Sequence, residues 1–147
     1  MQSQRRAEVI ESLGKAVRRF IAGSILFNLK VAQDLGTNAI DLQCLNLLEI
    51  QQNVRPGDLA KWTRLSTGGV TVVLDRLEAA GYIQREPNPE DRRSSIVRLV
   101  PGSLRKLQTI YRSKGEGLVS VLSEYNDHDL RVILDFFEKT NRAGAEF

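Results

Sequence analysis

The residues best suited to chemistry in this 147-residue chain lie in two short segments that are close in sequence. The first, residues 66–76, contains small and hydroxylic side chains followed by one arginine. The second, residues 91–93, is Asp-Arg-Arg within a turn rich in proline and charge. Hydroxyl and guanidinium groups donate hydrogen bonds to phosphate oxygens and to the edges of bases. Both segments therefore suit binding of a polyanion.

The first segment requires a helix to present it. Apolar residues recur there at helical spacing, at Val70, Val73, Leu74 and Leu77. Ser66 is a plausible N-cap for this helix, and Gly81 follows it as a terminating glycine. If the apolar residues face the core, the opposite face presents Gly68, Thr71, Val72 and Asp75, flanked by Thr67 and Arg76.

Each exposed position of this helix has a predicted contact with DNA. Small groups near the helix N-terminus suit entry into a major groove about 12 Å wide. There Thr71 can hydrogen-bond base edges, and Val72 can meet a thymine methyl group. Ser66 and the first-turn amides can hold a phosphate, and Arg76 is placed to reach the DNA backbone.

The second segment requires a β-hairpin. Residues 82–85 and 96–100 are predicted strands that flank a long polar tip, EPNPEDRRSS. An arginine of this tip can enter a minor groove, and Asp91 can orient its guanidinium through a bidentate pair. The alternative for Arg92 and Arg93 is a solvated turn, which their closeness to the preceding helix disfavours.

The remaining elements are predicted helices. Residues 8–34 form one long amphipathic helix that stops at Leu35-Gly36, and Asn38 caps a second helix ending near Ile50. Pro56 opens a short helix, and two more follow the hairpin, from about Ser103 and from Asn126 or Asp127. The predicted fold is mostly α with a small β-hairpin wing, in a single domain: a winged helix-turn-helix.

Composition narrows the function classes. The net charge of +3 permits a polyanionic partner without requiring one, and the tail from residue 120 is acidic. One cysteine and one histidine exclude a disulfide within the chain and a thiolate–imidazole zinc site. Paired nucleophile and base, phosphate-binding glycine loop and metal-ligand cluster are all missing, so we expect no enzyme and no cofactor. Without a membrane-length apolar segment or a signal sequence, we expect a soluble, cytoplasmic protein.

Residues 58–100, DLAKWTRLSTGGVTVVLDRLEAAGYIQREPNPEDRRSSIVRLV, resemble the MarR family of transcriptional regulators. The match consists of a DLA helix, a second helix ending in DRLEAAGYI, and a wing carrying Asp-x-Arg. This combination is much more specific than a generic helix-turn-helix. The helices on either side have the order and approximate lengths of the family, so the resemblance covers nearly the whole chain.

The resemblance implies an obligate homodimer on a pseudo-palindromic DNA operator, usually acting as a repressor. Residues 36–101 would form the DNA-binding lobe, and residues 1–35 and 102–147 the helical dimerisation region. Arg93 would be the wing residue that reaches the minor groove, with Asp91 as its partner. Many members of the family release DNA when a small aromatic or phenolic ligand binds between the two regions, so such an effector is expected here.

Some residues have alternative interpretations. Cys44 could sense oxidants, but a position among core leucines favours a buried thiol. His128 could be a metal ligand or pH sensor, although a surface residue is favoured, and Trp62 could line a ligand pocket, although packing of the short helix is favoured. Gly115 and Gly117 could form a hinge or permit close helix packing, and the sequence does not separate these. The competing function is a winged-helix protein-interaction module with only non-specific DNA binding.

Overall fold

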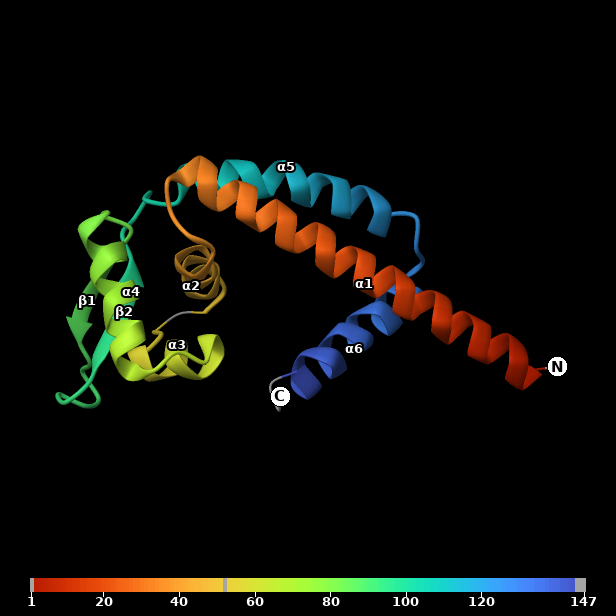
Figure 1. Cartoon of the computed structure of the whole chain (residues 1–147), viewed down its shortest axis with the longest axis horizontal. Helices are drawn as coiled ribbons and strands as arrows, with labels where there is room; N and C mark the ends of the chain where they lie inside the picture. The colour runs from red at the N-terminus through yellow and green to blue at the C-terminus, as the bar shows by residue number, and fades with distance from the viewer. Residues whose placement is uncertain (1, 52, 145–147) are drawn as a thin grey trace.

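The structure is a computed structural model that describes residues 2–51 and 53–144. Within these ranges lie six helices and one two-stranded sheet, in the predicted order. They are α1 (Gln2–Leu35), α2 (Ala39–Ile50), α3 (Pro56–Thr63), α4 (Thr67–Ala79), β1 (Ile83–Pro87), β2 (Ser95–Leu99), α5 (Arg105–Leu122) and α6 (Asp127–Gly144). Helices α2 to α4 and the hairpin gather at the C-terminal end of α1, and α5 returns alongside α1 (Figure 1).

Helix α1 is longer than predicted. It begins by Gln2 instead of near residue 8, because residues 2–7 contain neither proline nor glycine and include Arg5, Arg6 and Ala7, which favour helix. Its end is as predicted: Gly36 has a φ of +67° and breaks the helix after Leu35. Asn38 then caps α2, and its side-chain oxygen accepts a hydrogen bond from the Asp41 amide at 2.9 Å.

Helix α2 forms the centre of a compact lobe. Leu42 and Leu45 have no exposed surface, and the buried side chains of α3, α4, the hairpin and the start of α5 pack in the same cluster. The members of this cluster outside α2 include Leu59, Val70, Val73, Leu74, Leu77, Ile83, Val97 and Leu107. The four apolar positions that define the inner face of α4 are therefore buried as predicted.

Helices α3 and α4 are joined by a tight turn. Pro56 is the first residue of α3, as predicted, and Arg64 ends that helix in the left-handed conformation with a φ of +58°. Ser66 caps α4 by accepting a hydrogen bond from the Gly69 amide at 3.1 Å. This pair of helices is the predicted helix-turn-helix.

The hairpin is antiparallel, with Ile83 opposite Leu99 and Pro87 opposite Ser95. Each predicted strand is displaced by one or two residues at its ends, since 82–85 is observed as 83–87 and 96–100 as 95–99. Val54, before α3, adds an isolated bridge to Val97, and its carbonyl accepts the Val97 amide at 2.8 Å. This bridge fixes the start of α3 against the wing.

A large apolar surface of the long helices is uncovered in this chain. On α1 the exposed residues include Val9, Leu13, Phe20, Ile21, Ile25 and Leu26. On α5 and α6 they include Leu118, Val119, Val132, Leu134, Phe136 and Phe137. Soluble monomers seldom expose contiguous apolar surface of this kind, which typically marks an interface. In the described ranges, no helix combines the length and apolarity needed to cross a membrane.

Candidate nucleic-acid interface

Helix α4 has an outer face of small, exposed groups over its first turns. Thr67, Gly68, Thr71 and Val72 are all exposed, and Val72 is 54% exposed in spite of its apolar side chain. The Thr71 hydroxyl donates to the Thr67 carbonyl at 3.0 Å, which leaves its oxygen able to accept. Ser66 uses its hydroxyl oxygen as the helix cap. The predicted outer face is thus present and open to solvent.

Arg76 is held by a carboxylate of the same chain. Its Nε donates to Asp41 Oδ2 at 3.0 Å, and its Nη2 donates to Asp41 Oδ1 at 2.6 Å. Asp41 is buried, and these side-chain hydrogen bonds raise the pKa of Arg76 above its usual value. From the sequence, Arg76 was predicted to contact the DNA backbone. In the structure, two of its nitrogens instead bind Asp41 and join α4 to α2.

Arg85 makes a second connection to α4, which sequence reasoning missed. Its Nη2 lies 2.8 Å from Asp75 Oδ1, and its Nε donates to Glu78 Oε2 at 3.0 Å. The backbone amide of Arg85 also donates to Glu78 Oε1, at 3.1 Å, and the hydrogen bonds from Arg85 lower the pKa of Glu78. The first strand of the wing is therefore fixed to the C-terminal half of α4.

The wing tip is ordered by its own hydrogen bonds. Asn88 is buried, and its side chain donates to the Ser94 hydroxyl at 2.9 Å. The Ser94 amide donates to the Asp91 carbonyl at 2.9 Å, which closes the turn. Arg92 and Arg93 lie within this turn and are exposed.

The predicted bidentate pair between Asp91 and an arginine guanidinium is wrong for this structure. Asp91 Oδ1 instead accepts the backbone amide of Arg93, at 3.0 Å. The reason is local, because an aspartate reaches the amide two residues ahead more readily than a side chain that extends from the turn. Asp91 thus shapes the main chain that carries Arg93.

The structure gives the exposure or position of each residue that has alternative interpretations. Cys44 is 1% exposed, and burial, followed by the nearby charge of Asp41, raises the pKa of its thiol to about 11. His128 is exposed at the start of α6, as favoured from the sequence. Trp62 is 49% exposed, so about half of its surface is covered by the chain, as packing of the short helix requires, and about half is open to solvent. Gly115 and Gly117 lie inside a continuous α5.

An open helix of small groups, held beside an arginine-bearing hairpin, defines the class of winged helix-turn-helix proteins. Residues 35–94 match the model of the MarR family. The HTH-type transcriptional regulator YcgE of Bacillus subtilis is 33% identical over 134 residues, covering 91% of this chain and 87% of that protein. The chain belongs to the MarR family of transcriptional regulators.

Another relative is similar over part of the chain, and solved structures share its fold. The multiple antibiotic resistance protein MarR of Salmonella typhimurium is 30% identical over 86 residues, 58% of this chain and 60% of that protein. A MarR transcriptional regulator of Methanosarcina mazei has the same fold, with a TM-score of 0.65, 20% identity and coverage of 92% of this chain and 98% of the other. A mutant MarR of E. coli, solved in complex with operator DNA, has a TM-score of 0.58, 22% identity and coverage of 87% and 92%.

Proposed function

We propose that the protein is a sequence-specific transcriptional repressor that binds a pseudo-palindromic operator as a homodimer. The observation that carries this proposal is the open outer face of α4, with Thr71 and Val72 exposed, next to the exposed Arg92 and Arg93 of the wing. A helix of this kind fits a major groove, and an arginine on a projecting turn fits the adjacent minor groove. A dimer seated across an operator excludes other proteins from that DNA.

The proposed division of labour at the interface follows the geometry. Thr71 and Val72 would contact base edges, while Thr67, Gly68 and the capped first turn at Ser66 would contact a phosphate. Arg93, and to a lesser extent Arg92, would enter or flank the minor groove, on a turn shaped by Asp91. Because Arg76 is held by Asp41, we assign it the positioning of α4.

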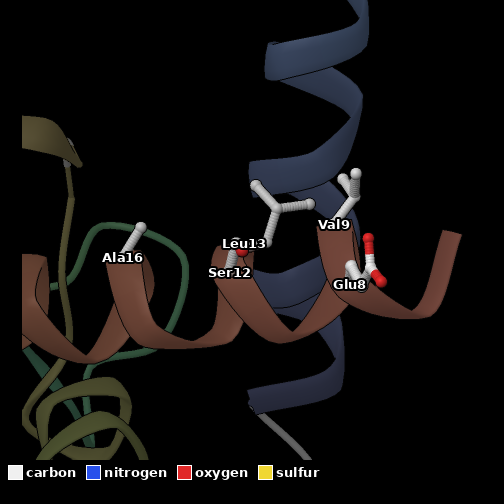
Figure 2. Close-up of a pocket in the computed structure, with 5 residues that line it drawn as sticks. All are labelled: Glu8, Val9, Ser12, Leu13 and Ala16. Atoms are coloured by element: carbon white, nitrogen blue, oxygen red, sulfur yellow. The ribbon is translucent and has the colours of Figure 1, made fainter. Parts of the chain in front are cut away.

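A homodimer is supported by the uncovered apolar surface of α1, α5 and α6. On α1, Val9, Leu13 and Ala16 project from one side and line a hollow of about 380 Å³ (Figure 2). On α6, Phe136 and Phe137 stand edge to face, with their ring centroids 5.5 Å apart and both rings about half exposed. A second copy of the chain would cover both surfaces. We therefore propose 36–101 as the DNA-binding lobe, and 1–35 and 102–147 as the dimerisation region.

A small aromatic or phenolic effector would fit the cavity between α1 and α5. This cavity of about 550 Å³ is lined by Phe20, Phe27, Tyr111 and Lys114, among others. Lys114 Nζ lies 4.9 Å from the centre of the Phe27 ring, so a cation and an aromatic wall share the space. Asn46 of α2 donates a hydrogen bond to the Tyr111 hydroxyl in the wall of this cavity. A ligand bound in the cavity would therefore act on a contact with the DNA-binding lobe. A ligand that favours another lobe spacing would lower operator affinity.

The test is DNA binding by an Arg93→Ala variant, measured by fluorescence anisotropy with a labelled duplex. We expect at least roughly thirtyfold weaker binding, because the homodimer would lose one groove contact in each half-site and each good contact provides about 1–3 kcal/mol. Arg112→Ala is the matched control, because Arg112 is exposed on α5, outside the proposed interface with DNA. Light scattering should give the same mass for both variants and the parent chain. Unchanged DNA binding by Arg93→Ala would refute the role of the wing.

A further inference from the structure

A cleft whose lining includes several charged side chains lies between the first turns of α3 and the start of β2. It has a volume of about 470 Å³. Its α3 wall includes Arg55, Gly57, Asp58 and Lys61, and its wing wall is formed by Arg93, Ser94 and Ser95. The two walls are fixed to each other because the Val54 carbonyl accepts the Val97 amide at 2.8 Å.

The charge in this cleft is positive. Three cations, Arg55, Lys61 and Arg93, line the cleft together with one acid, Asp58, and the charges of Asp91 and Glu90 at the wing tip also act on Arg55. Asp58 is occupied by Arg55, whose backbone amide and Nε donate to Asp58 Oδ2 at 3.0 and 3.2 Å. Among the described residues, neither Lys61 nor Arg93 takes part in an ion pair. The cations of the cleft without an ion-pair partner are therefore Lys61 on one wall and Arg93 on the other, and the charge of Lys61 also acts on Asp58.

We propose that this cleft binds a phosphate of the DNA backbone, with Lys61 as its direct cationic contact. The Ser95 hydroxyl provides a second donor from the wing wall, and Asp58 positions Arg55 so that its charge stays at the cleft. The proposal rests on the proposed function, since it requires DNA at the wing.

The DNA backbone is the phosphate source that the geometry favours. The cleft shares Arg93 with the wing tip, and each minor groove is bordered by the phosphates of both strands. A wing arginine in the groove would thus bring a bordering phosphate towards the base of the wing, where Lys61 lies. Such a contact fixes the position of the lobe on the duplex and carries no sequence information.

The test compares Lys61→Gln with Lys30→Gln, an exposed lysine of α1 away from the cleft. Affinity is measured from 50 to 200 mM KCl for the duplex that the wild-type chain selects from a random pool, and for an unrelated duplex. Loss of one phosphate contact by each subunit of the dimer should lower the salt slope of log K by about 1.8 in Lys61→Gln only. Binding to both duplexes should weaken by a similar factor, about fivefold per contact and about 25-fold in all, so that the preference between them is unchanged.

Two further measurements distinguish the loss of a phosphate contact from a folding defect in Lys61→Gln. Lys61→Arg should restore the wild-type slope, because it restores the charge. A duplex with one methylphosphonate in place of the contacted phosphate should bind the wild-type chain about fivefold less well, and should bind Lys61→Gln no worse than the unmodified duplex.

Each contrary result has a distinct meaning. If the salt slope of log K is the same for Lys61→Gln and Lys30→Gln while the selected duplex still binds, the cleft proposal is overturned. The proposed function would then still stand. If the wild-type chain binds no duplex, both are overturned. If inorganic phosphate binds the wild-type chain but not Lys61→Gln, and the slopes are equal, the cleft is a site for free anions and the DNA assignment is wrong.

Discussion

The guanidinium of Arg76 in α4 clasps the buried carboxylate of Asp41 in α2 through two hydrogen bonds, of 3.0 and 2.6 Å. Asp41 is also the residue whose amide is capped by Asn38, so the pair fixes the start of α2 to the last turn of α4. The side chain of Asp41 is 4% exposed, while that of Arg76 is 49% exposed. The two partners are therefore in unequal environments, and their contact helps to fix the orientation of α4 against α2.

We expect unequal losses of stability when the Asp41–Arg76 pair is broken. Arg76→Gln leaves a buried carboxylate without its cation, whereas Asp41→Asn leaves an arginine that water can solvate. Asp41→Asn should cost about 1.5 kcal/mol of unfolding free energy, the value of a hydrogen bond to a charged group, and Arg76→Gln should cost more. Urea denaturation of both variants and of the double variant measures this. Equal, additive losses would show that the pair is uncoupled.

Substitutions of two exposed apolar residues should separate DNA binding from dimerisation. Val72→Asp places a negative charge on the outer face of α4 and should abolish specific DNA binding while the dimer persists. Phe137→Asp, on the uncovered face of α6, should shift the mass in sedimentation from dimer to monomer, because it places a charge in the proposed interface. A Phe137→Asp chain that stays dimeric would exclude this face from the interface, and a Val72→Asp chain that binds specifically would exclude α4 from base contact.

The Tyr111 hydroxyl should couple the effector cavity to the DNA-binding lobe. It accepts from Asn46 of α2 at 3.0 Å and donates to Asn28 of α1 at 2.7 Å. Tyr111→Phe should lose about 1–2 kcal/mol of stability from these two hydrogen bonds. It should also weaken the release of DNA by benzoate or phenol, the probes we would titrate. Tyr125→Phe, at an exposed tyrosine beyond α5, is the control; an equal change in both variants would contradict the coupling.

Cys44 should be unreactive at neutral pH and should make stability fall at alkaline pH. Burial raises the pKa of its thiol from 9.0 to about 11, so the folded chain keeps this proton to higher pH than the unfolded chain. The contribution of the protonated thiol is therefore fully present below pH 9 and is lost as the pH rises towards 11. The difference in unfolding free energy between wild type and Cys44→Ala should shrink across this window. Alkylation at pH 8 as fast in buffer as in urea would contradict the buried thiol.

The elements were predictable from the sequence because their signals are local. Caps at Asn38 and Ser66, the helix-breaking Gly36 and the apolar spacing of α4 each depend on neighbours within a few residues. The open positions of the outer face, including Thr71 and Val72, followed from the same helical spacing. The strands were displaced by one or two residues, since their ends depend on pairing across the hairpin.

The long-range polar contacts were not predictable from one sequence. Asp41 lies in the first turn of α2, where an acidic residue needs no partner from another element, and Arg76 lies 35 residues away. Arg76 was in turn expected at the DNA backbone, because an exposed arginine on a recognition helix gives no sign of a buried partner. The Asp91 prediction failed for the opposite reason, since a main-chain amide two residues away competes with any side chain. The partner of a polar side chain therefore depends on which groups the fold brings within reach.

Recognition of DNA by sequence as a dimer can be tested by selection from a random duplex pool. The purified chain is incubated with the pool at physiological salt, and the bound molecules are sequenced. We predict enrichment of an inverted repeat whose half-site centres are about 10 base pairs apart, one turn of the double helix. Binding without any enriched sequence, lost steadily as salt rises, would contradict recognition by sequence and favour a winged-helix interaction module that contacts only the DNA backbone.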